Sequence, residues 1–268
     1  AKDEQDRIGA TVAAARTIPG VDVVIVVDDG SRDDTARVAR SVGATVVRHS
    51  HNRGKGAAMR TGAAVVSGLD TRDGRAEPRH LLFLDADLEE TAQAGEALVD
   101  PVRHGKADMT IAVLPPQKRA GGGFGFVVRA SRAGIRKLTD FDPIQPLSGQ
   151  RCLTRAAFDA AQPLAYGWGV ETGLTIDLIR KGYRIEEVET DFHHRVTGRD
   201  LRAQVHRLRQ YAHVQAAIAS RRLGAAAATG TTGANGTETA GANRTETAGA
   251  NRTAATDATG VAARDPDR

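Results

Sequence analysis

The stretch that decides the fold is His80-Leu-Leu-Phe-Leu-Asp-Ala-Asp-Leu88, an apolar run that ends in two carboxylates. Side chains alternate along an extended backbone, so Asp85 and Asp87 are predicted to point the same way at the C-terminal end of a strand. In an open α/β sheet that end is where ligands bind. Two hard oxygen donors suit Mg²⁺ or Mn²⁺, which in turn can hold a diphosphate. Taken alone, the same pattern fits a strand followed by a solvated turn.

Strands and helices alternate around this stretch. Residues 21–27 are β-branched and predict a strand buried on both faces, which ends in Asp28-Asp-Gly-Ser31. Ser31 and Asp34 have the spacing of a capping box, so a helix is expected from Ser31 to about Val42. Strand–helix–strand alternation favours a parallel sheet with right-handed crossovers. The other expected helices cover 5–16, 57–67, 91–103, 126–138, 167–181 and 200–223, and the other expected strands cover 44–48, 109–113, 150–153 and 183–188.

Composition narrows the class of function. The 268 residues are enough for one large α/β domain, and the formal charge of +4 favours an anionic substrate or a membrane surface. Aromatic residues make up only 4%, which argues against a nucleic-acid partner that would need base stacking. Cys152 is the single cysteine, so no intrachain disulfide forms and a reducing, cytoplasmic location is expected. No apolar run reaches the roughly 20 residues of a membrane span, and no signal peptide is present.

The composition changes abruptly after Leu223. Residues 233–256 form an eight-residue repeat of Ala, Gly, Thr and Asn with almost no large apolar side chains. Such a segment cannot offset the entropy of folding. We therefore predict a folded domain over 1–223 and a disordered tail over 224–268.

Several motifs coincide in order and spacing. They are Ala1-Lys-Asp-Glu4, Asp28-Asp-Gly-Ser31, Asn52-x-Gly-Lys-Gly-x-Ala58 and Leu84-Asp-Ala-Asp87. On these motifs the chain resembles a family 2-type glycosyltransferase of the GT-A fold over about residues 1–200. Three later segments are similar to glucosyl-3-phosphoglycerate synthases: Pro146-Leu-Ser-Gly-Gln-Arg151, Gly169-Val-Glu-Thr-Gly173 and His194-Arg195. The Asn-x-Gly-Lys-Gly and Asp-Ala-Asp motifs are also like those of dolichyl-phosphate glucosyltransferases, so the subfamily stays open.

The resemblance implies a metal site. Asp87 would bind Mg²⁺ or Mn²⁺ directly, while Asp85 would touch the ribose or share the metal. His194 would be a further metal ligand, and imidazole is a common ligand in Mn²⁺-type sites. The ion would stabilise the negative charge that develops on the departing diphosphate. A surface histidine beside a basic helix is the alternative reading of His194.

The resemblance also implies a nucleotide site. Asp29 would accept a hydrogen bond from the base or nearby groups, and Glu4 would contact the nucleoside. Lys55 lies between two glycines, where a cation can approach the diphosphate. The alternatives are a helix-capping turn at Asp28-Asp29 and an ordinary glycine-rich turn with a solvated Lys55.

The acceptor side is less defined. Glu171 would deprotonate the acceptor hydroxyl in an inverting enzyme and position substrates in a retaining one, although a glutamate at a helix N-terminus is also favoured by the helix dipole. Arg195 and Arg199 are candidates to clamp phosphate, and Arg151 is a candidate to meet an anionic acceptor. Trp168 is a candidate to stack on a sugar, although a lone tryptophan more often packs against its neighbours.

One departure concerns the first strand. The family pattern has a central strand immediately before the Ala1–Glu4 segment, whereas this sequence starts at Ala1 without an initiator Met. We therefore expect either residues before Ala1 or a sheet without its first strand, in which the strand ending at Asp29 loses a neighbour.

The sequence thus predicts an enzyme, a metal-dependent hexosyltransferase. It would move a sugar from a nucleoside-diphosphate sugar, UDP-glucose or a relative, to a phosphorylated small molecule or a polyprenyl phosphate. The sequence is also compatible with peripheral contact with the inner face of a membrane and with a homodimer. Two alternative functions are weighed against this one. A nucleotidyltransferase would show a Gly-rich loop where Lys2-Asp3-Glu4 stands. A catalytically silent sugar-nucleotide binding protein would lose Asp87 or His194.

Overall fold

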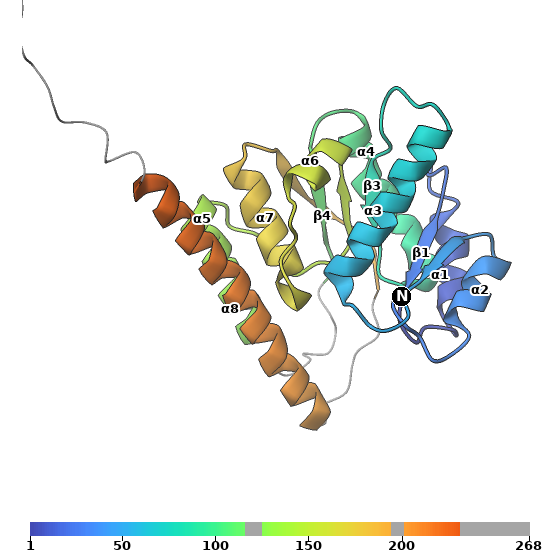
Figure 1. Ribbon diagram of the computed structural model, residues 1–268, viewed down its shortest axis with the longest axis horizontal. Coiled ribbons are helices and arrows are strands. Elements are labelled where there is room, and N and C mark those ends of the chain that lie inside the picture. Colours follow the sequence, from blue (N-terminus) through green and yellow to red (C-terminus); the bar gives the residue numbers. More distant parts are fainter. Residues whose placement is uncertain (116–124, 194–200, 231–268) are drawn as a thin grey trace, which may run out of the picture.

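The structure, a computed structural model, describes residues 1–115, 125–193 and 201–230, with only the backbone described for 201–207 and 224–230 (Figure 1). Its strands are β1 (Ile25–Asp28), β2 (Thr45–Arg48), β3 (Leu81–Phe83), β4 (Met109–Val113), β5 (Arg151–Leu153) and β6 (Ile185–Glu189). Its helices are α1 (Ile8–Ala15), α2 (Thr35–Ser41), α3 (Lys55–Arg72), α4 (Glu96–Arg103), α5 (Gly125–Thr139), α6 (Arg155–Ala160), α7 (Val170–Arg180) and α8 (Leu201–Gly230), with 3-10 helices η1 (Glu89–Gly95) and η2 (Gly167–Gly169).

The strands form two separate sheets. β1 and β2 pair in parallel, and the second sheet has the order β3-β5-β4-β6. β5 runs antiparallel to both of its neighbours, whereas β4 and β6 are parallel. The predicted GT-A-type α/β architecture is confirmed, with a mixed sheet in place of a parallel one at β5. The long excursion between β4 and β5 brings the chain back into the sheet at the end where β4 leaves it, with Arg151 opposite Ile111, so β5 runs in the opposite direction.

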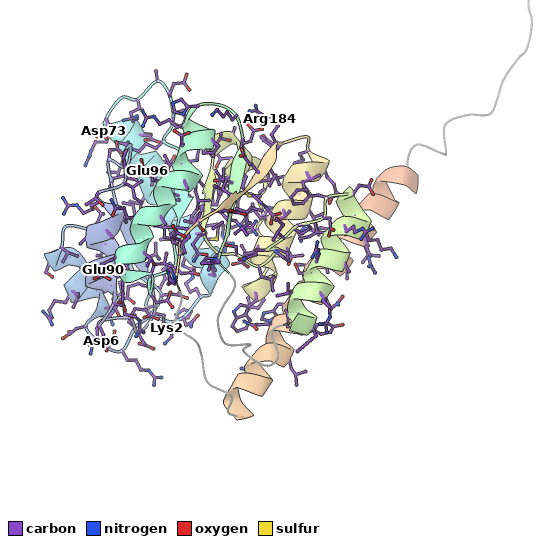
Figure 2. The ribbon with its side chains drawn as sticks, turned by 180° about the vertical axis from the view of Figure 1, so that it is seen from behind. Lys2, Asp6, Asp73, Glu90, Glu96 and Arg184 are labelled. Carbon is purple, nitrogen blue, oxygen red and sulfur yellow. The ribbon has the colours of Figure 1, made fainter. Side chains whose placement is uncertain are left out.

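Helices cover both faces of the sheets. α3 lies in front in Figure 1, while α4 lies in front when the molecule is seen from behind in Figure 2. The main apolar core lies between α3, α6 and α7 and the strands β3 to β5, and a second core packs α4 against the other face. A third joins α1, α2 and β1, and a fourth joins α5, α7 and α8. Near-complete burial of β4, with Met109 and Ile111 at 0% exposure, explains its continuous apolar sequence.

Element boundaries differ from the sequence-based expectations in several places. α3 begins at Lys55 and continues to Arg72, so part of the expected loop after residue 68 is helical. β1 begins only at Ile25, and β3 has three residues because the chain turns after Phe83. The expected helix over 91–103 is divided into η1 and α4. α6 had not been predicted, because it offers a single buried aromatic and too few residues to show a helical period.

The C-terminal part also corrects an expectation. α8 continues to Gly230, so residues 224–230 are helical rather than disordered. Their alanines have high helix propensity, which lets an established helix continue. Residues 231–268 lie outside the described part of the chain, so the predicted disorder there remains a prediction. Among the residues that the structure describes, no helix is long and apolar enough to cross a membrane.

Candidate active site

One cavity of about 1340 Å³ collects the residues singled out from the sequence. Six of the predicted site residues line it, namely Glu4, Asp29, Lys55, Asp85, Asp87 and Glu171. They come from the N-terminal segment, the turns after β1 and β3, and the first turns of α3 and α7. His194, Arg195 and Arg199 lie outside the described residues.

Lys55 is the centre of this cavity. Its Nζ lies 2.9 Å from Asp85 Oδ1 and 3.0 Å from Glu171 Oε1, so one ammonium joins two carboxylates from distant parts of the chain. Burial works against the charge of Lys55, but the two carboxylates outweigh it and raise the pKa of the ammonium above its ordinary value. Lys55 therefore stays charged over the whole physiological pH range.

A loop before β5 closes over this pair. Gln150 Nε2 donates to Asp85 Oδ2 at 2.8 Å. At Gly149, a Cβ atom would come within 2.3 Å of Lys55 Nζ and 2.9 Å of Asp85 Oδ2, so only glycine permits this approach. Sequence reasoning missed both residues, although they belong to the Pro146–Arg151 segment that carries part of the resemblance.

The Asp-Ala-Asp segment is a turn rather than the end of a strand. β3 ends at Phe83, so strand alternation does not decide where Asp85 and Asp87 point. The turn is fixed instead by Thr11 of α1, whose buried hydroxyl donates to Ala86 O at 2.9 Å and accepts from Glu89 N at 2.8 Å. Thr11 is thus a positioning residue, and the local sequence around residue 85 does not predict its contact with this turn.

Asp29 has a different environment. Its Oδ1 accepts from His49 Nδ1 at 2.7 Å and from Arg53 N at 2.8 Å, and its Oδ2 accepts from Gly54 N at 2.8 Å. Burial works against the charge, but these donors outweigh it and lower the pKa of Asp29. The carboxylate thus holds the loop that leads into Lys55, and His49 must carry its proton on Nδ1 to donate this bond.

The N-terminal segment lies against the turn after β1. Glu4 accepts from Arg7 Nε at 2.8 Å, and its backbone N–H donates to Thr35 Oγ1 at 2.8 Å. The predicted capping box is wrong, because Ser31 Oγ accepts from Asp3 N rather than from the helix. α2 begins later, at Thr35.

Arg151 and Trp168, the two other candidates from the sequence, differ in whether they line the cavity. Arg151 is 1% exposed and donates to Thr175 Oγ1 at 2.9 Å and to Pro146 O at 3.1 Å, and burial lowers its pKa to about 10. It ties the loop before β5 to α7 and is not among the residues that line the cavity. Trp168 lines the cavity and stacks on His213 of α8, with ring centroids 5.3 Å apart and planes at 19°.

The donor set suits a hard divalent cation that arrives with its substrate. In the described part of the chain no three His, Cys, Asp or Glu side chains form a ready metal cluster. Mg²⁺ usually takes one or two carboxylates and completes its coordination with substrate phosphates and water. Both Asp85 oxygens already receive protein donors, from Lys55 and Gln150. These two bonds tie Asp85 to Lys55 and to the loop before β5, and the carboxylates of Asp85 and Asp87 are among the oxygen ligands that the cavity offers such an ion.

Comparison with known proteins points to the same chemistry. The family model for glycosyl transferase family 2 matches residues 1–158. Glycosyltransferase AglJ of Haloferax volcanii is 29% identical over 186 residues, which cover 66% of this chain and 56% of AglJ. The succinoglycan biosynthesis protein ExoU of Rhizobium meliloti is 32% identical over 148 residues, which cover 51% of this chain and 43% of ExoU. The chain thus spans about half the length of the curated relatives it matches.

Solved structures agree. Glucosyl-3-phosphoglycerate synthase from Mycobacterium tuberculosis, in complex with Mn²⁺, uridine diphosphate and phosphoglyceric acid, matches with a TM-score of 0.65 and 26% identity, covering 82% of this chain and 75% of that one. Its complex with Mn²⁺, UDP-glucose and phosphoglyceric acid matches with the same TM-score and identity, covering 82% and 76%. With the family model matching more than half of its length, the chain belongs to glycosyl transferase family 2.

Proposed function

We propose that this glycosyltransferase moves a hexose from a UDP-hexose, UDP-glucose or a close relative, to a phosphate-bearing acceptor with the help of Mn²⁺ or Mg²⁺. The choice of donor and metal is supported by the structural neighbours that hold UDP, UDP-glucose and Mn²⁺. Phosphoglyceric acid in the same neighbours supports a phosphorylated acceptor. A polyprenyl phosphate offers the same anionic group and is the other acceptor to test.

The single observation that carries the proposal is the bridging position of Lys55. An ammonium has three donors, so Lys55 can hold Asp85 and Glu171 and still bind a phosphate oxygen. The cavity lining carries seven acidic side chains, among them Asp85, Asp87 and Glu171, against five lysine and arginine side chains. A divalent cation bound by Asp87 would offset the charge of a diphosphate in such a site. The ion, when bound, supplies a Lewis acid for the departing diphosphate.

Glu171 has the geometry of an acceptor-side residue. It begins α7, is 7% exposed, and lies across Lys55 from Asp85. In transfer to a hydroxyl, the acceptor oxygen bonds to the anomeric carbon as the bond from that carbon to the diphosphate oxygen breaks, and the hydroxyl proton passes to Glu171 in an inverting reaction. In a retaining reaction Glu171 positions the substrates instead. A phosphate nucleophile carries no such proton and needs no base.

Donor and metal are tested by thermal shift with UDP-glucose, UDP-N-acetylglucosamine and GDP-mannose, each with and without Mn²⁺. A ligand at 100 times its Kd stabilises the native state by about 2.7 kcal/mol, so binding raises the Tm. We expect a Mn²⁺-dependent rise with a uridine donor that is lost in Asp87→Ala. A rise with GDP-mannose alone, or one that Asp87→Ala preserves, would overturn the donor or the metal assignment.

The acceptor is tested by product analysis with 3-phosphoglycerate and with a short polyprenyl phosphate, using wild type and Glu171→Gln. Loss of a general base slows transfer to a hydroxyl by roughly 100-fold or more. Transfer to phosphate oxygen should change far less. Binding of the donor with no product from either acceptor would instead support a silent sugar-nucleotide binding protein.

A further inference from the structure

The helix α8 brings side chains to the active-site cavity, although none of the candidate residues from the sequence lies in it. It runs beside α5 and α7 in Figure 1, where Val214 and Ile218 are buried in the core that the three helices share. Gln210 and Val214 line the cavity, and residues four apart lie on the same face of a helix. One turn of α8 therefore forms part of the wall of the site.

The segment just before Glu171 is packed against this turn of α8. Gly167 has a φ of +59°, and a Cβ atom there would collide with His213 Nδ1. At Gly169 a Cβ atom would lie 2.6 Å from His213 O, which is also too close. The glycines on both sides of Trp168 are therefore what lets η2 approach His213.

The start of α3 packs against the same segment. A Cβ atom at Gly56, the residue after Lys55, would lie 3.1 Å from Val170 Cγ2. The residue that follows η2 is thus in close contact with the helix turn that presents Lys55, while η2 itself is in close contact with α8. Trp168, at the centre of η2, lines the same cavity as Lys55 and Glu171. The position of its indole therefore concerns the reaction.

His213 holds Trp168 in two ways. Its imidazole stacks on the indole, with ring centroids 5.3 Å apart and planes at 19°. The backbone N–H of Trp168 donates to His213 Nδ1 at 3.4 Å, so the neutral imidazole carries its proton on Nε2. The ring of Tyr166 meets the same imidazole at 78°, with centroids 5.1 Å apart. Trp168 is 36% exposed, so an indole held by His213 still presents aromatic surface to the cavity.

We propose that His213 is a positioning residue for sugar transfer, which fixes the indole of Trp168 as a wall for the transferred hexose. The inference rests on the proposed function, in which the diphosphate lies at Lys55 and the acceptor oxygen at Glu171, so that the hexose lies between them. A hexose has an apolar C–H face that can pack on an aromatic ring. An indole already held by His213 loses less freedom when the sugar binds, and the affinity for the sugar is higher for that reason.

The test compares the binding of UDP-glucose with that of UDP, each with Mn²⁺, by calorimetry on wild type, His213→Ala and His213→Phe. Removing the imidazole frees the indole, so the Kd of UDP-glucose should rise roughly 2- to 10-fold in His213→Ala, while the Kd of UDP stays unchanged. His213→Phe keeps a flat ring behind the indole and should restore most of the affinity for UDP-glucose. A general loosening of the structure would weaken both ligands together, and that result would contradict the positioning role.

A matched substitution on α8 locates the effect. Gln215 is half-buried, as His213 is, but lies two residues along the helix and so about 200° around it. Gln215→Ala removes a polar side chain from the same helix and should leave the Kd values of UDP-glucose and UDP unchanged. If Gln215→Ala weakened UDP-glucose as much as His213→Ala does, the effect would belong to α8 as a whole and the assignment to His213 would be wrong.

Fluorescence tests the hold on the indole directly. Trp168 is the only tryptophan of the chain, so the tryptophan emission reports on this ring alone. Time-resolved anisotropy should show faster motion of the indole in His213→Ala than in wild type, and UDP-glucose, but not UDP, should slow that motion. Equal anisotropy decays in the two proteins, or an unchanged ratio of the two Kd values, would overturn the inference. A wild type that binds neither ligand would instead overturn the proposed donor, and with it the contact to the hexose.

Discussion

The turn after β1 and the turn after β3 each carry a pair of aspartates, yet their surroundings differ. Asp29 is 7% exposed, and its two oxygens accept three hydrogen bonds from the loop at residues 49–54. The Asp85 side chain is 36% exposed and pairs with Lys55 in the open cavity. Asp29 accepts its hydrogen bonds mostly from backbone groups of one loop, whereas Asp85 accepts from two side chains at the cavity, Lys55 and Gln150. We therefore propose that the first pair of aspartates serves mainly stability and the second pair serves the reaction.

Of the substitutions considered, replacing Asp87 in the turn after β3 should have the largest effect, and that effect should be on sugar transfer. Asp87→Asn removes a carboxylate proposed to hold the cation, so kcat/KM for transfer should fall on the order of 100- to 1000-fold. Glu90→Gln is the matched control, because Glu90, which is labelled in Figure 2, is exposed, lies three residues along the chain and loses the same charge. The measurement is product formation with Mn²⁺ and the donor found by thermal shift. Near-wild-type activity in Asp87→Asn would contradict the metal assignment.

Replacing Asp29 should mainly affect stability. Asp29→Asn removes the negative charge that accepts three hydrogen bonds, and the new amide N–H faces one of the donors. The substitution should lower the free energy of unfolding by about 2–4 kcal/mol. Chemical denaturation checks this value. Asp85→Asn, at a half-exposed position, should cost less. If Asp85→Asn were the more destabilising of the two, the proposed division between the turns would be wrong.

Thr11 links the second turn to α1 and should have an intermediate effect. Thr11→Val keeps the shape but leaves Ala86 O and Glu89 N without the hydroxyl, which should lower stability by about 1–2 kcal/mol. The Mn²⁺ concentration needed for half-maximal activity should also rise, because the Asp-Ala-Asp turn loosens. Thr71→Val, on an exposed turn of α3, controls for loss of a hydroxyl. An unchanged Mn²⁺ requirement in Thr11→Val would show that Thr11 is structural only.

The smallest expected effect is on the pH dependence of stability. The pKa of Asp29 is lower in the folded chain than the ordinary value of 3.8. Its contribution is therefore present above about pH 3.8 and is lost as the pH falls through the lower folded-state pKa. The Tm of wild type should fall more steeply below about pH 4 than that of Asp29→Asn, which cannot titrate. Asp6→Asn, a change at an exposed aspartate that is labelled in Figure 2, should keep the wild-type slope.

Much of the fold was accessible from local patterns. The β-branched run before Asp28 and the apolar run before Asp85 each predicted a strand, and both are present, although shorter than expected. β4 agreed residue for residue at Met109–Val113. Such elements are encoded by neighbours in sequence, through side-chain alternation and propensity. Boundaries moved where a distant partner decided them, as at Ser31, whose hydroxyl meets Asp3 rather than the helix that follows it.

The motifs of the sequence determined the family and singled out Asp85, Asp87 and Lys55, which the structure brings to one cavity. Only the tertiary structure decided which carboxylate is saturated with donors, that Arg151 is buried, and that Gly149 and Gln150 close on Asp85 from 65 residues away. It also divided the strands into two sheets and placed the Ala1 nitrogen against Val27 O. The physical reason is that periodicity records which face of an element is apolar, whereas hydrogen bonds between remote segments depend on how those faces are packed together.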